Sequence, residues 1–314
     1  MSVLSIKNLS FNYPNNSILK NINIHVDQGE IVSILGGSGV GKTTLFNLIA
    51  GINELQYGTI EIQGDSNFKG KVSYMLQKDL LLEHKTVIQN IILPLLIKKV
   101  NKKEAEAEAI KNLKLFNLYD YKDKYPSELS GGMRQRVALL RTYMFKEELF
   151  LLDEPFSALD PITRTQLQEW LYELQQELKK TIIFVTHDMD EALKLADKIC
   201  IMQGGKIQQY DTAENLLKHP VNNFVKDFIG SDRLWSAPEY IKAKDIMIKN
   251  PVKAIETRTV IQVMEIMRTN KVDSILVTDK NNLLVGILTV KELRQNGIQD
   301  YYIYKIMNKN PLFI

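Results

Sequence analysis

Short apolar runs separated by turns dominate the N-terminal part of the chain, and this pattern predicts β-strands. The run from Ile31 to Leu35 is almost wholly apolar, which is typical of a buried strand. Turn-forming residues that include Gly29 separate it from the run before it. The predicted strands cover residues 4–9, 18–26, 31–35, 59–62 and 72–75.

The hydrophobic period changes to that of a helix from about residue 87 to residue 118. Residues 102–110 are rich in alanine, glutamate and lysine, which are strong helix formers. A charged linker would have a similar composition, but Ile110, Leu113 and Leu118 recur at helical spacing. We therefore expect a helical block at this point of the chain.

A strand–helix–strand rhythm returns from Glu148 onward. Strands that alternate with helices favour a parallel sheet, because each helix carries the chain back to the start of the next strand. The sequence therefore predicts an α/β fold, with a mostly parallel sheet and an inserted helical block. The elements expected in this part are strands at 149–152, at 181–186 and from 199, and helices at 161–179 and 190–196.

A second region begins near Gly230, where the composition shifts. The chain of 314 residues is long enough for two domains, because single cores rarely grow beyond about 250 residues. Beyond the shift, residues 246–251 recur with one change at 306–311, and a fixed period marks repeated units. We expect a first domain at 1–230, a linker at 231–243, and a repeat region at 244–314 with one repeat complete and the second only begun.

Composition narrows the functional classes. The net charge of +3 is too small and too evenly spread to favour a nucleic-acid partner. A single cysteine, Cys200, excludes an internal disulfide framework. The apolar stretch 91–97 is too short to span a membrane, and the N-terminal residues lack the features of a signal peptide. We expect a cytosolic protein that reaches a membrane only through partners.

Residues 36–43 fit the phosphate-binding pattern G-x-x-x-x-G-K-[ST]. They follow the predicted strand 31–35 and precede a stretch of helical character, which is the context that this motif needs. Glycines let backbone N–H groups turn toward a phosphate, and a helix N-terminus adds positive potential. Lys42 would reach the outer phosphates and the Thr43 hydroxyl would bind Mg²⁺, whereas a glycine-rich turn without a ligand is the plain alternative.

Two carboxylates follow the predicted strand 149–152. ATP hydrolysis needs Mg²⁺ to be held and a water molecule to be aimed at the γ-phosphorus. Asp153 fits the first of these roles, and Glu154 is placed to polarise the water. An acidic pair can also cap a helix, but Pro155 follows this pair and favours the catalytic interpretation.

The segment from Leu129 to Gln135, Leu-Ser-Gly-Gly-Met-Arg-Gln, resembles the signature motif of ATP-binding-cassette (ABC) ATPases. With the phosphate loop and the acidic pair, the resemblance covers roughly residues 1–230. It implies a P-loop NTPase core of mostly parallel strands, an antiparallel β subdomain and a helical subdomain at about 78–135. It also implies ATP and Mg²⁺ as cofactors and ATP hydrolysis coupled to transport as the activity.

The remaining motifs of this family match further residues. Gln77 resembles the glutamine that contacts Mg²⁺ or water and moves with the membrane partner. Residues 157–160 resemble the D-loop, which ends at Asp160, and His187 resembles the histidine that contacts the γ-phosphate. Tyr13 resembles the aromatic residue that stacks on adenine, with Phe11 as its rival. The nucleotide contacts implied are Tyr13, Gly36, Gly37, Ser38, Gly39, Val40, Gly41, Lys42, Thr43, Thr44 and Gln77. Magnesium is assigned to Thr43, Gln77 and Asp153, and catalysis to Glu154 and His187.

In this family the signature motif acts on a second copy of the chain. The resemblance implies that Ser130, Gly131, Gly132 and Gln135 close over ATP bound by the other copy, in a head-to-tail dimer with two sandwiched ATP molecules. We therefore expect an isolated monomer to be inactive. A cassette without a fused membrane domain resembles a bacterial importer subunit. This implies an integral membrane permease, an extracellular solute-binding protein as an indirect partner, and a peripheral location on the cytoplasmic face of the membrane.

Residues 272–279 and 284–293 resemble the strand–turn–strand–helix core of a CBS domain. Thr289 and Glu292 occupy positions where such domains often hold a nucleotide ribose, so the candidate ligands are an adenine nucleotide or a cyclic dinucleotide. A purely structural dimerisation module is the alternative.

The cassette and the CBS region together resemble the importers of glycine betaine, carnitine and choline. Residues 78–83 and 132–142 look more like those of nitrate- and taurine-type importers. A nitrate, sulfonate or pyrimidine-precursor importer and a non-catalytic nucleotide-sensing regulator are therefore the alternative functions.

Overall fold

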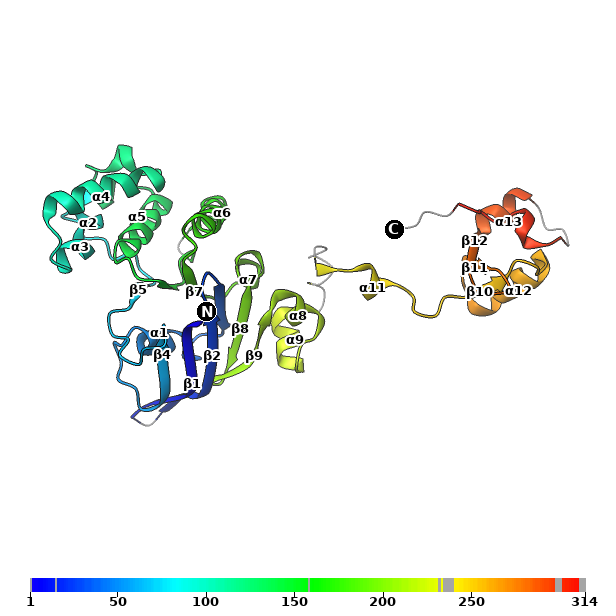
Figure 1. Cartoon of the computed structure of the whole chain (residues 1–314), viewed down its shortest axis with the longest axis horizontal. Helices are drawn as coiled ribbons and strands as arrows, with labels where there is room; N and C mark the ends of the chain where they lie inside the picture. The colour runs from blue at the N-terminus through cyan, green and yellow to red at the C-terminus, as the bar shows by residue number, and fades with distance from the viewer. Residues whose placement is uncertain are drawn as a thin grey trace. The chain divides into compact units, whose positions relative to one another are not determined.

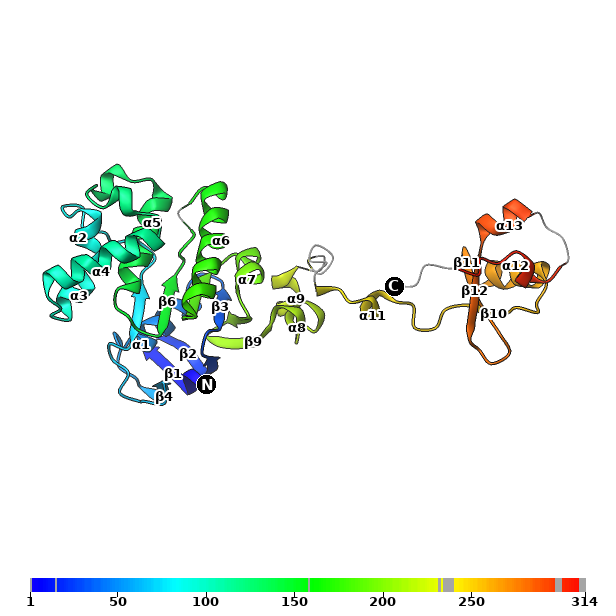
Figure 2. The same cartoon turned by 45° about the horizontal axis from the view of Figure 1, so that its top comes forward.

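The computed structural model describes residues 2–14, 16–157, 159–230, 233, 240–296 and 301–310, without the side chains of residues 245, 246 and 296. These residues form two compact units, of which the first ends at Tyr240 and the second begins at Ile241. Most of the expected linker at 231–243 lies outside the described residues. Figures 1 and 2 label the elements of each unit.

A six-stranded sheet forms the centre of the first unit, in the order β5-β6-β7-β3-β8-β9. All neighbouring strands run parallel except β9, which pairs antiparallel with β8. The predicted parallel sheet is therefore confirmed. Its strands are β3 (Ile31–Gly36), β5 (Val72–Met75), β6 (Leu149–Asp153), β7 (Thr181–Thr186), β8 (Lys198–Gln203) and β9 (Lys206–Thr212).

The two faces of this sheet contribute to different hydrophobic cores. Phe150 and Leu152 pack with the helical block, whereas Leu149 and Leu151 pack with a second, antiparallel sheet. This division follows from the alternation of side chains along a strand. The second sheet has the order β2-β1-β4, and its strands are β1 (Ser2–Tyr13), β2 (Asn16–Asp27) and β4 (Tyr57–Ile62).

The expected helical block consists of several short helices. Pro94 stands in the first turn of α3, where its missing N–H costs nothing, and Asn101 caps the start of α4. In Figures 1 and 2 the helices α2 to α5 gather on one side of the first unit, away from β1 and β2. The block contains α2 (Val87–Ile91), α3 (Leu93–Ile97), α4 (Lys102–Leu115), α5 (Gly131–Tyr143) and the 3₁₀ turns η1 (Tyr119–Tyr121) and η2 (Pro126–Glu128).

The other helices of the first unit pack beside the large sheet. The helices expected at 161–179 and 190–196 are observed within a few residues of those bounds. The helices are α1 (Lys42–Ile49), α6 (Pro161–Leu178), α7 (Met189–Leu195), α8 (Ala213–Lys218) and α9 (Asn223–Ile229).

The second unit has a small three-stranded sheet in the order β10-β11-β12, with helices packed against it. The start of the second sequence repeat adds to this sheet, because Asn308 bridges to Ile287 of β12 and Met307 is buried. Residues 311–314 lie outside the described residues. The elements are α11 (Ala243–Ile246), β10 (Lys253–Ile255), α12 (Val260–Asn270), β11 (Ser274–Thr278), β12 (Leu284–Thr289), α13 (Val290–Asn296) and η4 (Ile303–Lys305).

Candidate active site

Four strands of the large sheet bring the predicted site residues to one edge. Strands β3, β5, β6 and β7 are parallel, so their carboxyl ends lie on the same side of the molecule. The segments that follow them carry the phosphate loop, Gln77, Glu154 and His187 respectively. Ligands of open α/β sheets bind outside the carboxyl ends of the strands, and this edge is therefore the candidate active site.

The phosphate loop connects β3 directly to helix α1. Gly41 has a φ of +106°, and a Cβ atom built on it would lie 2.7 Å from Cδ2 of Leu19, so only glycine fits this position. Among the described residues, no side chain caps α1 and its first turn carries no acidic residue. The helix N-terminus thus fits an anionic phosphate. The other predicted contacts lie in the loop (Gly36, Gly37, Ser38, Gly39, Val40) or in the first turn of the helix (Lys42, Thr43, Thr44).

The ammonium group of Lys42 is folded onto this loop. Its Nζ donates hydrogen bonds to the carbonyl oxygens of Gly36 at 2.7 Å and Gly37 at 2.9 Å. Burial lowers the pKa of Lys42, and the nearby carboxylates of Glu154 and Asp153 act in the opposite direction. Lys42 is therefore a cation already positioned between the phosphate loop and the acidic pair.

Thr43 and Asp153 are hydrogen-bonded to each other at the carboxyl ends of the parallel strands. The hydroxyl of Thr43 donates to Oδ2 of Asp153 at 3.3 Å. Burial raises the pKa of Asp153, and the hydrogen bond from Thr43 opposes this effect. A buried carboxylate beside a hydroxyl is a donor set that fits a hard divalent cation such as Mg²⁺.

Glu154 has a backbone conformation that is unusual for a residue with a side chain. Its φ of +48° lies in the left-handed region, which is costly for a residue with a side chain and is often found at functional sites. Oε2 of Glu154 accepts a hydrogen bond from Nε2 of Gln77 at 3.0 Å, and its Oε1 lies 3.9 Å from Nδ1 of His187. The structure thus brings Gln77, Glu154 and His187 together, although they are far apart in the sequence.

The geometry distinguishes Tyr13 from Phe11 as the candidate adenine contact. Both belong to β1, and their rings meet edge to face with centroids 5.1 Å apart. Phe11 is buried in the core, whereas Tyr13 is 44% exposed. Of the two rings, Tyr13 is therefore the one that a ligand can reach.

The signature residues separate into an exposed pair and a buried pair. Ser130 caps helix α5 by accepting a hydrogen bond from the Met133 amide at 3.3 Å, and Ser130 and Gly131 are exposed. Gly132 is buried, and a Cβ atom built on it would lie 2.4 Å from Cγ2 of Thr163 in α6. Ser130 and Gly131 are thus available to a partner, while the missing side chain of Gly132 allows two helices of its own chain to approach.

Gln135 points into its own chain. It is buried, and its Nε2 donates to the carbonyl oxygen of Pro155 at 2.9 Å. Its position on α5 faces the exit of β6, so Gln135 contacts its own chain in this structure, and its contact with the second copy stays a prediction. Asp160 caps α6 by accepting a hydrogen bond from the Thr163 amide at 3.1 Å, and Ala158 of the predicted D-loop lies outside the described residues.

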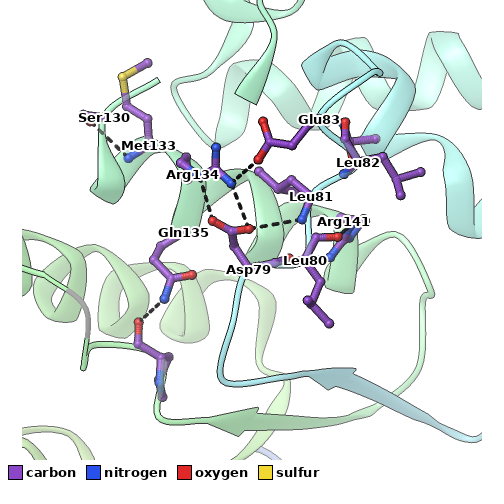
Figure 3. A network of polar contacts seen from close by, with 12 residues as sticks. Asp79, Leu80, Leu81, Leu82, Glu83, Ser130, Met133, Arg134, Gln135 and Arg141 are labelled. Atoms are coloured by element: carbon purple, nitrogen blue, oxygen red, sulfur yellow. Dashed lines mark hydrogen bonds and ion pairs between the residues drawn. The ribbon is translucent and has the colours of Figure 1, made fainter. Parts of the chain in front are cut away.

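A charged network beside the site was not assigned by sequence reasoning. Arg134 and Arg141 of α5 contact Asp79 and its neighbours in the segment that follows Gln77 (Figure 3). Asp79 and Arg134 are 55 positions apart, and their charges were the sole sequence signal. Opposite charges are too common in a sequence to indicate which pairs meet.

The two candidate ligand-binding residues of the second unit, Thr289 and Glu292, lie at the N-terminus of helix α13. The carboxylate of Glu292 accepts from the backbone amide of Thr289 at 3.0 Å and from the Thr289 hydroxyl. The Thr289 hydroxyl oxygen in turn accepts from the Lys291 amide at 3.2 Å. These contacts cap the first turn of α13, which is a structural role available to both residues without a ligand.

No helix among the described residues combines the length and the apolar character needed to cross a bilayer.

The chain matches known proteins over most of its length. The profile of the family described as "ABC transporter" matches residues 19–157, and that described as "CBS domain" matches residues 243–297. The chain is 39% identical to the carnitine transport ATP-binding protein OpuCA of Listeria monocytogenes over 305 residues, which cover 94% of this chain and 77% of the relative. It is 41% identical to the glycine betaine/carnitine/choline transport ATP-binding protein OpuCA of Bacillus subtilis over 288 residues, 88% of this chain and 76% of the relative.

A solved structure shares the fold of the first unit. It is the dimeric post-hydrolysis state of the ATP-binding cassette MJ0796 bound to ADP and Pi. The TM-score is 0.59 at 28% identity, and the alignment covers 67% of this chain and 98% of that one. These matches confirm the predicted fold class and the resemblance on which it rested. The chain belongs to the ATP-binding proteins of ABC transporters, and it carries a CBS domain in addition to its cassette.

Proposed function

We propose that this chain hydrolyses ATP to power the uptake of a quaternary amine osmoprotectant through a membrane permease. The observation that carries the ATPase assignment is the position of Glu154, held by Gln77 beside the phosphate loop. The class of solute is supported by the two bacterial relatives, which are named as carnitine and glycine betaine/carnitine/choline transport proteins.

Each part of the reaction has a candidate residue, either at the carboxyl ends of the parallel strands or, for adenine, at the end of β1. Loop amides and Lys42 bind the phosphates, and Tyr13 stacks on the adenine. Thr43 and Asp153, with Gln77, would hold Mg²⁺, which would neutralise phosphate charge. Glu154 accepts the proton of the attacking water, because its carboxylate stands at the strand exit next to the phosphate loop.

A second copy of the chain completes each site. Ser130 and Gly131 are exposed at the N-terminus of α5, where free amides and the helix dipole favour an anion. We therefore infer a head-to-tail dimer in which these residues contact the γ-phosphate bound by the other copy. The dimeric form of the similar MJ0796 cassette supports this arrangement.

The membrane partners follow from the proposed role. The chain would bind a permease from the cytoplasmic face, and an extracellular solute-binding protein would deliver the solute to that permease. Recognition of the solute is then a property of the permease and the solute-binding protein, whereas this chain supplies the energy.

The test is uptake of radiolabelled glycine betaine, carnitine and choline. The host cells lack their own osmoprotectant importers and produce this chain with its permease and solute-binding protein. We expect uptake with the wild-type chain and with Glu173→Gln, an exposed α6 residue that serves as the matched control, and loss of uptake with Glu154→Gln.

Two outcomes would contradict the proposal. Unchanged uptake with Glu154→Gln would show that hydrolysis at this site does not drive transport. Uptake of nitrate or taurine without uptake of any of the three amines would support the importer role but contradict an osmoprotectant as the solute.

A further inference from the structure

Helix α5 carries Ser130 at its N-terminus and is tied to its own chain by polar contacts along one side (Figure 3). The contacts reach two segments, which follow β5 and β6. These segments hold Gln77 and Glu154, the two residues that are hydrogen-bonded to each other in the candidate active site. These polar contacts, called ties below, therefore connect Ser130, which is proposed to act on the ATP of the second copy, with the candidate active site of its own chain.

The first tie joins the first turn of α5 to the segment after Gln77. Nε and Nη2 of Arg134 donate to the two carboxylate oxygens of Asp79 at 2.7 and 3.2 Å, and Nη2 also donates to Oε1 of Glu83 at 2.7 Å. The side chains of Arg134 and Asp79 are only 24% and 22% exposed. A two-pronged contact of this kind fixes orientation as well as distance.

The charges at this tie are stabilised by each other. Burial opposes ionisation of Asp79, but hydrogen bonds from Arg134 and the Leu81 amide outweigh it and hold the pKa of Asp79 below its usual value. Hydrogen bonds to Asp79 and Glu83 raise the pKa of Arg134. Both groups are thus charged throughout the physiological pH range.

The second tie lies further along the same helix. Arg141 donates to the carbonyl oxygens of Asp79 at 2.6 Å and Leu80 at 2.8 Å. Leu80 has a φ of +45°, a conformation that an isolated leucine would avoid. Arg134 and Arg141 are seven positions apart, which places them on the same face of α5.

The third tie reaches the exit of β6. Nε2 of the buried Gln135 donates to the carbonyl oxygen of Pro155 at 2.9 Å, and Pro155 directly follows Glu154. Two adjacent residues near the start of α5, Arg134 and Gln135, therefore contact the segments that hold Gln77 and Glu154.

We propose that Asp79, Arg134 and Arg141 are positioning residues that make the two ATP sites of the dimer cooperative. They hold α5 to the segment after Gln77, so that Ser130 moves with it. A change around Glu154 in one site then alters how Ser130 closes over ATP in the other site. This inference rests on the proposed shared-site dimer.

A purely structural ion pair is the competing explanation. Breaking a partly buried pair lowers stability whatever else the pair does. The decisive readout is therefore the Hill coefficient for ATP hydrolysis, because uniform destabilisation lowers the amount of active protein but leaves the shape of the ATP dependence unchanged.

The experiment measures hydrolysis by the full chain over a range of ATP concentrations. The variants are Asp79→Asn, Arg134→Gln and the double variant. Glu108→Gln is the matched control, because Glu108 of α4 pairs with Lys146 at 2.7 Å. We expect the wild-type chain and the control to have a Hill coefficient above 1. Each single variant should approach 1, with the half-saturating ATP concentration raised by about 5-fold or more. The double variant should be no worse than Arg134→Gln alone, because that variant already loses the contact with Asp79.

Arg134→Lys keeps the charge and provides a second variant if the others fail to fold, as judged by thermal melting. It should have an intermediate Hill coefficient, since lysine cannot make the two-pronged contact. A wild-type Hill coefficient of 1, or wild-type cooperativity in folded Asp79→Asn and Arg134→Lys, would overturn the inference. Absence of any hydrolysis by the wild-type chain would instead contradict the proposed function, so the two failures are distinguishable.

Discussion

The two units each contain a pair of predicted ligand-binding residues, but the surroundings of these pairs differ. In the cassette, Gln77 and Glu154 come from separate strands and meet where the backbone of Glu154 is strained. In the CBS unit, Thr289 and Glu292 are three residues apart and bond to each other in an ordinary helix start. A contact between residues three apart can form whatever the rest of the fold is. A strained backbone conformation beside a contact between distant segments persists only when the surrounding structure holds it. The comparison therefore favours function for the first pair and a structural cap for the second.

The largest expected effect concerns Glu154. Glu154→Gln keeps the side-chain shape but removes the base, so we expect the turnover number for ATP to fall by about 10²–10⁴-fold with ATP affinity retained. Steady-state hydrolysis and binding of a fluorescent ATP analogue measure the two quantities, with Glu173→Gln as the control. Undiminished turnover would remove Glu154 from the mechanism. The functional difference inferred between the Gln77–Glu154 pair and the Thr289–Glu292 pair would then fail.

A second effect tests whether the cassette site is shared between copies. Ser130→Arg should lower hydrolysis by about 10²–10³-fold, because a donor to the phosphate is lost and a bulky side chain takes its place. Binding of ATP by the variant itself should be unchanged, since Ser130 acts on the other copy. Ser127→Arg, an exposed neighbour in η2, is the matched control. Wild-type specific activity that is independent of protein concentration, down to monomeric protein, would contradict the shared site.

The third prediction concerns affinity. Lys42→Ala should weaken ATP binding by about 10–100-fold, the loss expected for a charge-assisted hydrogen bond. Lys102→Ala, which removes an exposed ion pair with Glu106, should change the affinity by less than about 2-fold. Equilibrium titration with the fluorescent analogue provides the measurement, and wild-type affinity in Lys42→Ala would reject the phosphate-loop assignment.

The smallest effect is expected in the CBS unit. Thr289→Ala should lower the free energy of unfolding by about 1 kcal/mol through loss of the helix cap, and should leave ATP hydrolysis unchanged. Chemical denaturation of the full chain, followed in the second unit, tests this expectation. If the variant instead unfolds like the wild type but loses inhibition by an adenine nucleotide or a cyclic dinucleotide, the pair holds a ligand and the structural interpretation is wrong.

Sequence reasoning recovered the elements and motifs whose signals are local. The phosphate loop, the acidic pair after β6 and His187 after β7 lie at the predicted ends of strands, because apolar runs define those strands. For helix α5, the motif did not indicate the direction of each side chain. The motif alone grouped Gln135 with Ser130, yet a helix turns by about 100° per residue and directs them to different surroundings.

The sequence by itself determined the family, the α/β fold class and the residue types of the ATP site, since each depends on short patterns along the chain. The tertiary structure alone decided which of those residues meet. It placed Gln77 against Glu154, directed Gln135 toward Pro155, and paired Asp79 with Arg134 across 55 positions. The physical reason is that a side-chain contact depends on sheet order and helix packing, which are set by burial of the whole core and not by neighbours in the sequence.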